Sequence, residues 1–487
     1  MDNKELNNKI IDGLFWTYLE RISAQGVSVF VTILLARILL PQDFGIVSIV
    51  LIFITICDTL VTGGFSDALI QKQKSDDLDF SSLFWFVLTV GFFLYGMLFL
   101  SATYIESFFN IAQLAIIIQI MGLRIPINAI KTIQSAYISK NMKYKYFFIA
   151  TSFGTGISAI VGISMALLGK GVWALVAQYL TNSIIDTIVI WSTCGWHPKL
   201  IFSIKRLKKL YSFGWKMQLS TILSVLYKEL EVFCIGKKYS ATDLAFYERG
   251  KQFPKLIINN IQSSINKVML PAFSFLQTDK IKSKMYARKS IRISSFIMFP
   301  IFIGLILCAN EFITALLTRK WVSSVIYLQI LSIAYMCEPI LSIAKQILIA
   351  SGNSKKYLII EIQKKSIGII LLTCALLFFN KVFFVAISMM LTIIIGLFLQ
   401  SFSIVNIIQY SLKEQIKDIT IPLLFSLIMT IPIFLIKFLE LNIWIKLIFE
   451  IISAAGIYLI LAKFTNNQEL NTLIKYLKKF TVNLIRV

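Results

Sequence analysis

The feature that most constrains this chain is a series of apolar stretches that recurs along its whole length. A stretch of about 20 apolar residues crosses the hydrocarbon core of a bilayer, about 30 Å thick, as an α-helix. Hydrophobic residues make up 57% of the 487 residues and charged residues only 15%, whereas a soluble domain carries about 25% charged residues. The sequence therefore predicts an all-α polytopic membrane protein with about 14 transmembrane helices. The spans are expected near 13–36, 44–64, 81–103, 111–135, 146–168, 171–193, 212–236, 243–273, 290–309, 324–349, 357–379, 382–408, 418–437 and 442–462.

Basic residues gather in the short polar gaps between these spans. The net charge is +23, and in a soluble chain such an excess would suggest nucleic acid as a partner. Here the positive-inside rule explains it, because the cytoplasmic loops of membrane proteins are enriched in Lys and Arg. We therefore predict cytoplasmic termini, no nucleic-acid partner, and a first span that is kept as a helix rather than removed as a signal peptide. The gaps assigned to the cytoplasm contain Lys140, Lys143 and Lys145, then Lys199, Lys205, Arg206, Lys208 and Lys209, then Lys280, Lys282, Lys284, Arg288 and Lys289, then Lys355 and Lys356, and finally Lys475, Lys478 and Lys479.

A short motif occurs twice, after the first span and after the seventh. The segments 37–45 and 237–245 both pass from a basic residue to an aspartate, Asp43 or Asp243, that is expected to cap the next helix. Internal repeats of this kind are common in secondary transporters, whose binding site lies between the repeats. The predicted organisation is an N-terminal six-helix lobe at 1–200, a C-terminal six-helix lobe at 201–410, two extra helices at 411–464 and a cytoplasmic amphipathic tail at 465–487.

Charged residues inside the spans mark the candidate site. Each costs about 2.5–3.5 kcal/mol at the membrane centre, so it usually faces a partner or a wet cavity. In the eighth span, Arg249, Lys251 and Lys255 share one half of the helix with amides and serines, while isoleucines occupy the other half. Arg21 in the first span and Arg124 in the fourth lie on narrower polar stripes. These five residues predict a wet, positively charged site.

Three acids within the spans are candidates for coupling transport to an ion gradient. Asp58, Glu231 and Glu338 could compete with an anionic substrate for the cations when ionised and release them when protonated. Structural roles are equally open, because Asp58 could form a helix–helix hydrogen bond, Glu231 could pair with Lys228, and Glu338 with Lys345. The residues leave open whether protons or sodium ions would drive the cycle.

Motifs for ATP use and covalent catalysis are missing from the sequence. It contains no G-x-x-x-x-G-K-[ST] phosphate loop and no G-x-S-x-G nucleophile turn. Its six cysteines are scattered singly and there is one histidine, which argues against a zinc site or a disulfide framework. We therefore predict a protein that is not an enzyme and has no cofactor or metal.

The segments 33–45 and 64–71 resemble the polysaccharide transporter family, which includes the flippases for O-antigen, colanic-acid-like and capsular repeat units. They read Ile-Leu-Leu-Ala-Arg-Ile-Leu-Leu-Pro-Gln-Asp-Phe-Gly and Gly-Phe-Ser-Asp-Ala-Leu-Ile-Gln. The family belongs to the multidrug/oligosaccharidyl-lipid/polysaccharide superfamily. The resemblance implies two pseudo-symmetric six-helix lobes that form a V around a central cavity and work by alternating access.

The resemblance also implies a substrate, a polyprenyl-pyrophosphate-linked oligosaccharide carried from the cytoplasmic to the outer leaflet of the bacterial inner membrane. Binding of the pyrophosphate then falls to Arg21, Arg124, Arg249, Lys251 and Lys255. Membrane lipids, a polymerase and a chain-length regulator are the implied partners. The alternative is a multidrug antiporter of the same superfamily, which would favour an acidic cavity; a scaffold without transport would not need the polar half of the eighth span.

Overall fold

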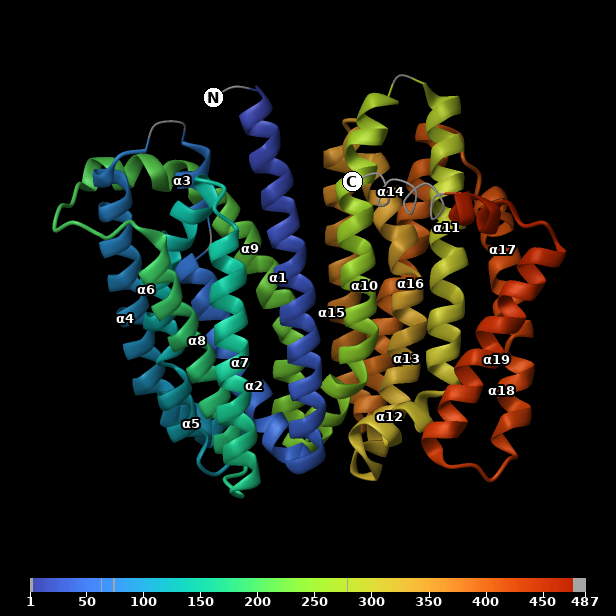
Figure 1. The fold of residues 1–487 in the computed structure, drawn as a ribbon, viewed down its shortest axis with the longest axis horizontal. Coiled ribbons are helices and arrows are strands. Elements are labelled where there is room, and N and C mark those ends of the chain that lie inside the picture. The colour runs from blue at the N-terminus through green and yellow to red at the C-terminus, as the bar shows by residue number, and fades with distance from the viewer. Residues whose placement is uncertain (1–2, 63, 73–74, 278, 476–487) are drawn as a thin grey trace. The chain divides into compact units, whose positions relative to one another are not determined.

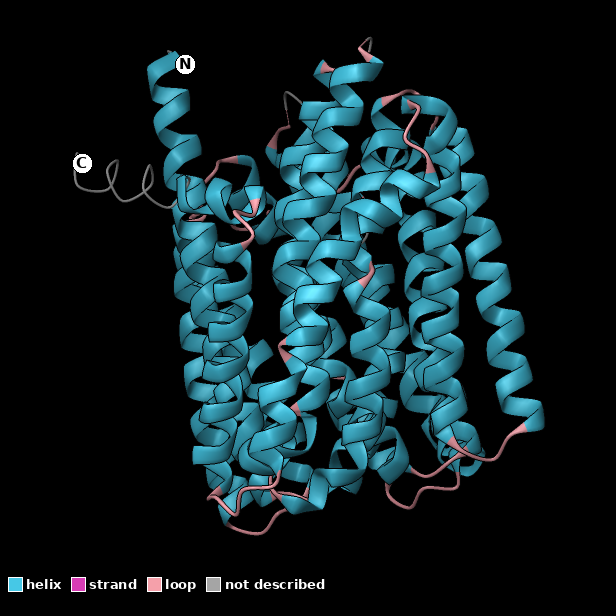
Figure 2. Cartoon of the chain, turned by 90° about the vertical axis from the view of Figure 1, so that its right-hand side faces the viewer, coloured by secondary structure: helices cyan, strands magenta, loops and turns pink. Residues whose placement is uncertain are grey.

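The computed structural model describes residues 3–62, 64–72, 75–277 and 279–475. These residues form α-helices and one short 3-10 helix, with no β-strand among them (Figure 2). The chain divides into two compact units, 1–245 and 246–487, and helix α10 (Ala241–Phe275) runs from one into the other. The lobes predicted at 1–200 and 201–410 are units of repeat rather than of compactness, and they remain a prediction. So do the two extra helices at 411–464 and the tail at 465–487, of which residues 476–487 lie outside the described residues.

The first unit is a bundle of long helices (Figure 1). Helices α7 and α8 pack against each other, α1 packs on α7, α6 lies between α4 and α8, and α9 packs on α2, α3 and α4. The helices are α1 (Asn3–Ile38), α2 (Pro41–Thr62), α3 (Phe65–Gln71), α4 (Asp77–Phe109), α5 (Leu114–Met121), α6 (Arg124–Lys140), α7 (Lys145–Leu167), α8 (Val172–Cys194) and α9 (Ile204–Lys238).

The second unit is also a helix bundle, with two separate apolar clusters. One cluster joins α10, α11, α14, α15 and α16 around Ile343 and Leu348. The other joins α11, α12, α17, α18 and α19 around Phe296 and Tyr458. The helices are α11 (Lys280–Leu307), α12 (Ala309–Leu317), η1 (Arg319–Ser324), α13 (Val325–Met336), α14 (Glu338–Ala350), α15 (Ser354–Phe378), α16 (Val382–Ile408), α17 (Leu412–Ile428), α18 (Thr430–Lys437) and α19 (Ile443–Phe464).

Eleven segments among the described residues are long and apolar enough to cross a membrane. The prediction of an all-α, multi-span membrane protein is therefore confirmed. The other three predicted spans correspond to α9, α10 and α15, which have 35, 35 and 25 residues. These helices are long enough to cross but carry too many charged residues to qualify by composition, so the count of about 14 remains a prediction.

Several predicted spans differ from the observed helices in detail. The spans 111–135, 324–349 and 418–437 are each broken into shorter helices, at 122–123, Cys337 and Met429. The predicted gap at 280–289 is helical, because these residues form the first turns of α11, and its position on the cytoplasmic side remains a prediction. Asp279 starts this helix by accepting the backbone N–H of Lys282 at 2.9 Å, and that bond holds the pKa of its carboxyl below the ordinary value.

The two aspartates of the repeated motif lie one turn away from the predicted cap position. Asp43 and Asp243 are the third residues of α2 and α10 rather than the caps. Asp43 Oδ2 accepts the backbone N–H of Leu40 at 3.0 Å, and Asp243 Oδ2 accepts the backbone N–H of Ser240 at 3.4 Å. Each aspartate thus bonds back to the residue before its helix, which is the acidic half of a capping box.

Candidate functional site

A polar pocket of about 460 Å³ lies inside the first unit. Helices α2, α3, α6 and α8 line it, and all of its lining residues except Ile70 and Ala136 are polar. Polar and charged side chains at membrane depth are costly, so a cluster of them indicates a functional site. The polar lining consists of Asp58, Thr62, Ser66, Arg124, Asn128, Lys131, Thr132, Ser135, Ser139, Asn182 and Ser183.

Arg124 is positioned in this pocket by a break in its span. The membrane-length segment Leu114–Lys140 is interrupted between α5 and α6, and Arg124 is the first residue of α6. A cation is unfavourable at a helix N-terminus, but the Tyr179 ring lies 5.2 Å from the guanidinium carbon and offers its negative face. Arg124 Nε donates to Ser183 Oγ at 3.1 Å. Its two terminal nitrogens donate to no described residue.

Asp58 faces the same pocket from α2. Asn128 Nδ2 on α6 donates to Asp58 Oδ2 at 3.0 Å, which is the helix–helix hydrogen bond weighed for this residue. The other carboxylate oxygen, Oδ1, is buried and has no hydrogen-bond partner among the described residues. One oxygen is thus fixed to the packing of the bundle, and the other can bind a proton or a cation.

Helix α8 contributes an acid that analysis of the sequence did not place in the site. Lys131 on α6 forms an ion pair with Asp186 on α8. Its charge is therefore held within the bundle by a partner. Gln178, Asn182 and Asp186 recur at intervals of four residues along α8, and this polar stripe was a signal available in the sequence. The small Gly154 of α7 packs beside Asn182 and Asp186, so the stripe is covered closely on that side.

Arg21 and its neighbour Glu20 lie outside the polar pocket. Arg21 is exposed on α1. Glu20 accepts a hydrogen bond from the hydroxyl of Thr151 on α7 at 3.1 Å, which ties α1 to α7. Arg21 therefore remains a predicted substrate-binding residue that the pocket in the first unit does not include.

The cations of α10 belong to the second unit, and aromatic rings flank two of them. Arg249 Nη1 donates to Gln252 Oε1 at 2.5 Å, and its guanidinium carbon lies 5.4 Å from the centre of the Trp321 ring. Lys251 is only 5% exposed, 3.7 Å from Glu248. Its Nζ is also 5.2 Å from the centre of the Tyr247 ring. Lys255 is half-buried on the same helix.

The two remaining predicted coupling acids lie in different helices. Glu338 on α14 accepts from Gln262 Nε2 on α10 at 3.2 Å. The alternative pair Glu338–Lys345 does not form among the described residues, and Lys345 Nζ lies 5.4 Å from the centre of the Tyr357 ring. Glu231 is half-buried on α9, and its role stays a prediction.

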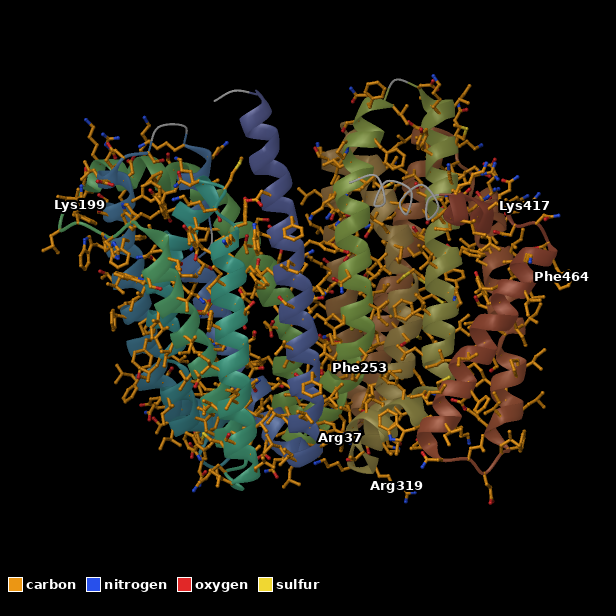
Figure 3. All side chains as sticks on the ribbon, in the orientation of Figure 1. Arg37, Lys199, Phe253, Arg319, Lys417 and Phe464 are labelled. Atoms are coloured by element: carbon orange, nitrogen blue, oxygen red, sulfur yellow. The ribbon has the colours of Figure 1, made fainter. Side chains whose placement is uncertain are left out.

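Charged residues lie at both ends of each unit. Figure 3 shows Arg37 and Lys199 at opposite ends of the first unit, and Arg319 and Lys417 at opposite ends of the second. The spans between these ends are apolar, and the polar pocket is formed by helices of the first unit. Fold and site together define a multi-span membrane protein with a charged pocket among its membrane-length helices.

The chain belongs to the polysaccharide biosynthesis protein family, which matches residues 34–326. This match confirms the resemblance carried by the segments 33–45 and 64–71. The chain is 22% identical to the succinoglycan biosynthesis transport protein ExoT of Rhizobium meliloti (strain 1021), over 63% of this chain and 62% of that protein. It is 24% identical to the lipopolysaccharide biosynthesis protein WzxC of Escherichia coli (strain K12), over 67% of each.

A third relative is the teichuronic acid biosynthesis protein TuaB of Bacillus subtilis (strain 168), 21% identical over 72% of this chain and 73% of that protein. The chain spans between 62% and 73% of the length of these relatives. Among solved structures, the lipid II flippase MurJ in an inward closed conformation is similar in fold. It has a TM-score of 0.75 and 18% identity, and the match covers 94% of this chain and 99% of that one. An inward-facing multidrug resistance MATE family transporter of the MOP superfamily follows, with a TM-score of 0.61, 14% identity and coverage of 82% and 99%.

Proposed function

We propose that this protein is a flippase that carries a polyprenyl-pyrophosphate-linked oligosaccharide repeat unit from the cytoplasmic to the outer leaflet by alternating access. The family match and the transport protein ExoT among its relatives support a transporter of polysaccharide precursors rather than an enzyme. The chain would act in the bacterial inner membrane with both termini in the cytoplasm. A polymerase and a chain-length regulator would receive its product.

Arg124 is the observation that carries this proposal. A pyrophosphate needs cationic hydrogen-bond donors in a site from which lipid is excluded, and arginine offers paired N–H groups that match phosphate oxygens. Arg124 is held through Nε by Ser183, so its terminal nitrogens point a preformed fork at the pocket. The glycan could lie among the amides and hydroxyls there, while the polyprenyl tail stays in the bilayer. Arg21, Arg249, Lys251 and Lys255 would supply further cationic contacts.

Release of the phosphate requires a difference in affinity between the two access states. Asp58 is the acid best placed to provide it, because it lines the same pocket as Arg124 and has one carboxylate oxygen without a hydrogen bond. When ionised, Asp58 would compete with the phosphate for Arg124. When it binds a proton or a sodium ion, it would leave Arg124 free to bind the substrate. Glu231 and Glu338 remain further coupling candidates.

A multidrug antiporter of the same superfamily is the competing function, since a drug transporter is among the proteins of similar fold. The charge of the pocket argues against it. Lys131 is neutralised by its ion pair with Asp186, and Arg124 is the cation of the pocket whose terminal nitrogens remain open to a ligand. A glycan with an anionic pyrophosphate suits these charges better.

The decisive experiment replaces Arg124 and measures surface polysaccharide in cells whose surface polysaccharide requires this protein. Arg124→Ala should lower surface polysaccharide about tenfold to a hundredfold, the effect expected from losing a charged hydrogen bond of about 1.5–3 kcal/mol. Arg124→Lys should restore part of the activity, because it keeps the charge but not the planar fork. Protein abundance in the membrane is measured alongside.

Arg319→Ala is the matched control. Arg319 is an exposed arginine of η1 outside the polar pocket, so its loss should leave surface polysaccharide unchanged. Normal polysaccharide in Arg124→Ala at normal abundance would overturn the assignment of the pocket. Accumulation of a fluorescent organic cation in cells carrying that variant, with unchanged polysaccharide, would favour the antiporter.

A further inference from the structure

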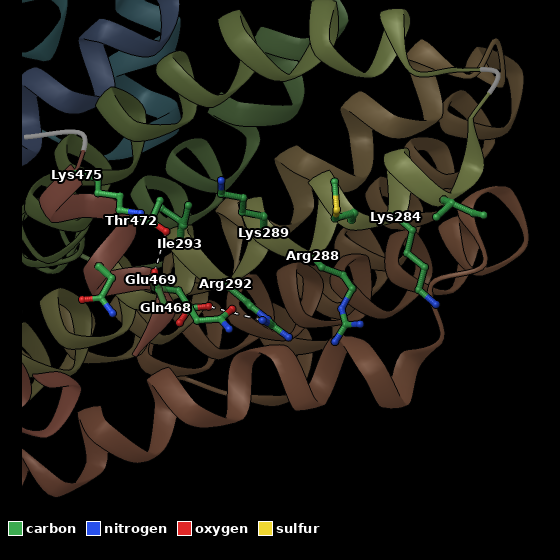
Figure 4. A pocket seen from close by; sticks show the side chains of 12 residues that line it. Lys284, Arg288, Lys289, Arg292, Ile293, Gln468, Glu469, Thr472 and Lys475 are labelled. Atoms are coloured by element: carbon green, nitrogen blue, oxygen red, sulfur yellow. Dashed lines mark hydrogen bonds and ion pairs between the residues drawn. The ribbon is translucent and has the colours of Figure 1, made fainter. Parts of the chain in front are cut away.

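A second pocket, strongly basic, lies at one end of the second unit and has no part in the proposed transport path. Its volume is about 670 Å³, and the first turns of α11 form one wall (Figure 4). A helical segment at 468–475, which follows α19, forms the other wall. The charged lining residues are Lys284, Arg288, Lys289, Arg292 and Lys475, with Glu469 as the single acid.

The two arginines are held rigidly from behind by a buried carboxylate. Asp418 is fully buried and accepts Arg288 Nε at 2.7 Å, Arg288 Nη2 at 2.9 Å and Arg292 Nε at 2.8 Å. The hydroxyl of Tyr410 completes its hydrogen bonds at 2.8 Å. One carboxylate thus fixes two guanidiniums, whose side chains remain about 30% and 33% exposed.

Two lysines of the pocket are exposed and have no partner among the described residues. Lys289 lies on α11 and Lys475 on the segment 468–475. Figure 4 shows Lys289 pointing away from Arg288 and Arg292. Lys284 is paired with Glu414 at 2.8 Å. The two arginines are also near acids, Arg288 at 3.8 Å from Glu414 and Arg292 at 3.9 Å from Glu469. The excess positive charge of the pocket therefore comes from the two lysines, and it suits a phosphate group.

The pocket lies at the level where lipid headgroups are expected. Helix α11 has 28 residues and is about 42 Å long, so its first turns extend beyond a hydrocarbon core of about 30 Å. Leu470 and Leu473 pack on the cluster formed by α17, α18 and α19, which holds the segment 468–475 at this level. Ile281 and Met285 also line the pocket and are 83% and 58% exposed.

We infer that this pocket binds the phosphate headgroup of an anionic phospholipid of the bilayer. The basic residues would hold the phosphate, and Ile281 and Met285 would contact the lipid below its headgroup. The apolar pair favours a lipid over free phosphate, because free phosphate gains nothing from exposed hydrocarbon. Basic pockets beside transmembrane helices at the cytoplasmic face commonly bind lipid headgroups. The inference does not depend on the transported substrate.

Lipid binding to the purified full-length protein tests this inference. Native mass spectrometry would measure the affinity for phosphatidylglycerol, with phosphatidylcholine of the same acyl chains and sodium phosphate as competitors. The wild-type protein should prefer phosphatidylglycerol. The double variant Lys289→Gln/Lys475→Gln should lose about 30-fold in that affinity and keep its unfolding temperature, since both lysines are exposed and unpaired.

The matched control is Lys413→Gln/Lys417→Gln, which removes the same charge from two exposed lysines of α17 outside the pocket. It should bind phosphatidylglycerol as the wild type does. Equal binding of the two lipids, an equal loss in both double variants, or wild-type affinity in the pocket variant would each overturn the inference. Displacement of phosphatidylglycerol by millimolar phosphate would identify a free-anion site instead. This experiment measures lipid binding and not flipping, so a negative result would not bear on the proposed transport function, which the Arg124 variants test separately.

Discussion

At the scale of single residues, several charges within the two helix bundles are paired between helices. Asp418 bonds to Arg288, Arg292 and Tyr410, and Lys131 pairs with Asp186. Removing one partner of a buried pair leaves the other charge without compensation, which costs far more than the pair itself contributes.

Asp418→Asn should therefore lower the free energy of unfolding by about 3 kcal/mol. The amide has the same size but cannot offset two guanidiniums, and its nitrogen would face their N–H groups. Thermal unfolding of the purified protein in detergent measures the change. Glu440→Gln serves as the control, since Glu440 is exposed in the loop after α18, and the unfolding temperature of this variant should stay at that of wild type. Equal unfolding temperatures for both variants would contradict the role given to Asp418.

Analysis of the sequence could find some residues of the site because charges within apolar spans are rare. Arg124 and Asp58 were both identified in this way, and they line one pocket. The polar stripe of α8 was visible in the sequence, but helical phase does not encode which helices become neighbours, so the ion pair of Asp186 with Lys131 on α6 could not be predicted. The burial of Lys251 could not be predicted from the sequence either, because it depends on how Tyr247 and Glu248 pack beside it.

At the scale of elements, the repeated motif brings two helix starts into close contact. A Cβ atom added at Gly45 on α2 would lie 1.7 Å from the carbonyl oxygen of Ala241, the first residue of α10. A backbone oxygen cannot move aside as a flexible side chain can. Glycine is therefore needed where these two helix starts approach each other.

Gly45→Ala should destabilise the protein by about 1–3 kcal/mol, the usual cost of overpacking. Gly96→Ala is the control, because Gly96 lies within α4 with no atom in reach of an added Cβ. That change should leave stability unchanged or raise it by up to about 1 kcal/mol, since alanine favours a helix. Folded yield and thermal unfolding in detergent compare the two. Indistinguishable variants would show that α2 and α10 do not approach this closely.

Sequence periodicity predicted the existence of the helices better than their ends. The predicted span 382–408 matches α16 (Val382–Ile408) at both ends, because Lys381 and Gln409 flank a segment that is mainly apolar. The predicted span 290–309 begins ten residues after the start of α11. A basic stretch is typical of a loop, and the sequence does not show that Asp418 binds the arginines of this one. The break before Arg124 was missed too, although Gly122 at the break and Pro126 in the first turn of α6 are signals for it.

At the scale of the whole molecule, orientation in the membrane is the property on which the direction of transport depends. The positive-inside rule assigns the basic gap before α9 to the cytoplasm. That gap is attached to the first unit: the backbone N–H of Lys199 donates to Ser81 Oγ at 3.0 Å, and that of Ser203 to Ser82 Oγ at 2.9 Å. Its position therefore reports the orientation of the first unit.

Helix α9 allows this orientation to be tested with one pair of positions. Lys205 and Lys238 are exposed and lie in its first and last turns, about 50 Å apart along the helix. In a background without the native cysteines, Lys205→Cys should resist a membrane-impermeant maleimide added to intact cells and react in inside-out vesicles. Lys238→Cys should show the opposite pattern. The reverse result would place the termini outside, and reaction of both positions from outside would show that α9 does not cross the bilayer. The expected pattern would place the substrate's entry on the side where the lipid-linked precursor is made, as a flippase working outward requires.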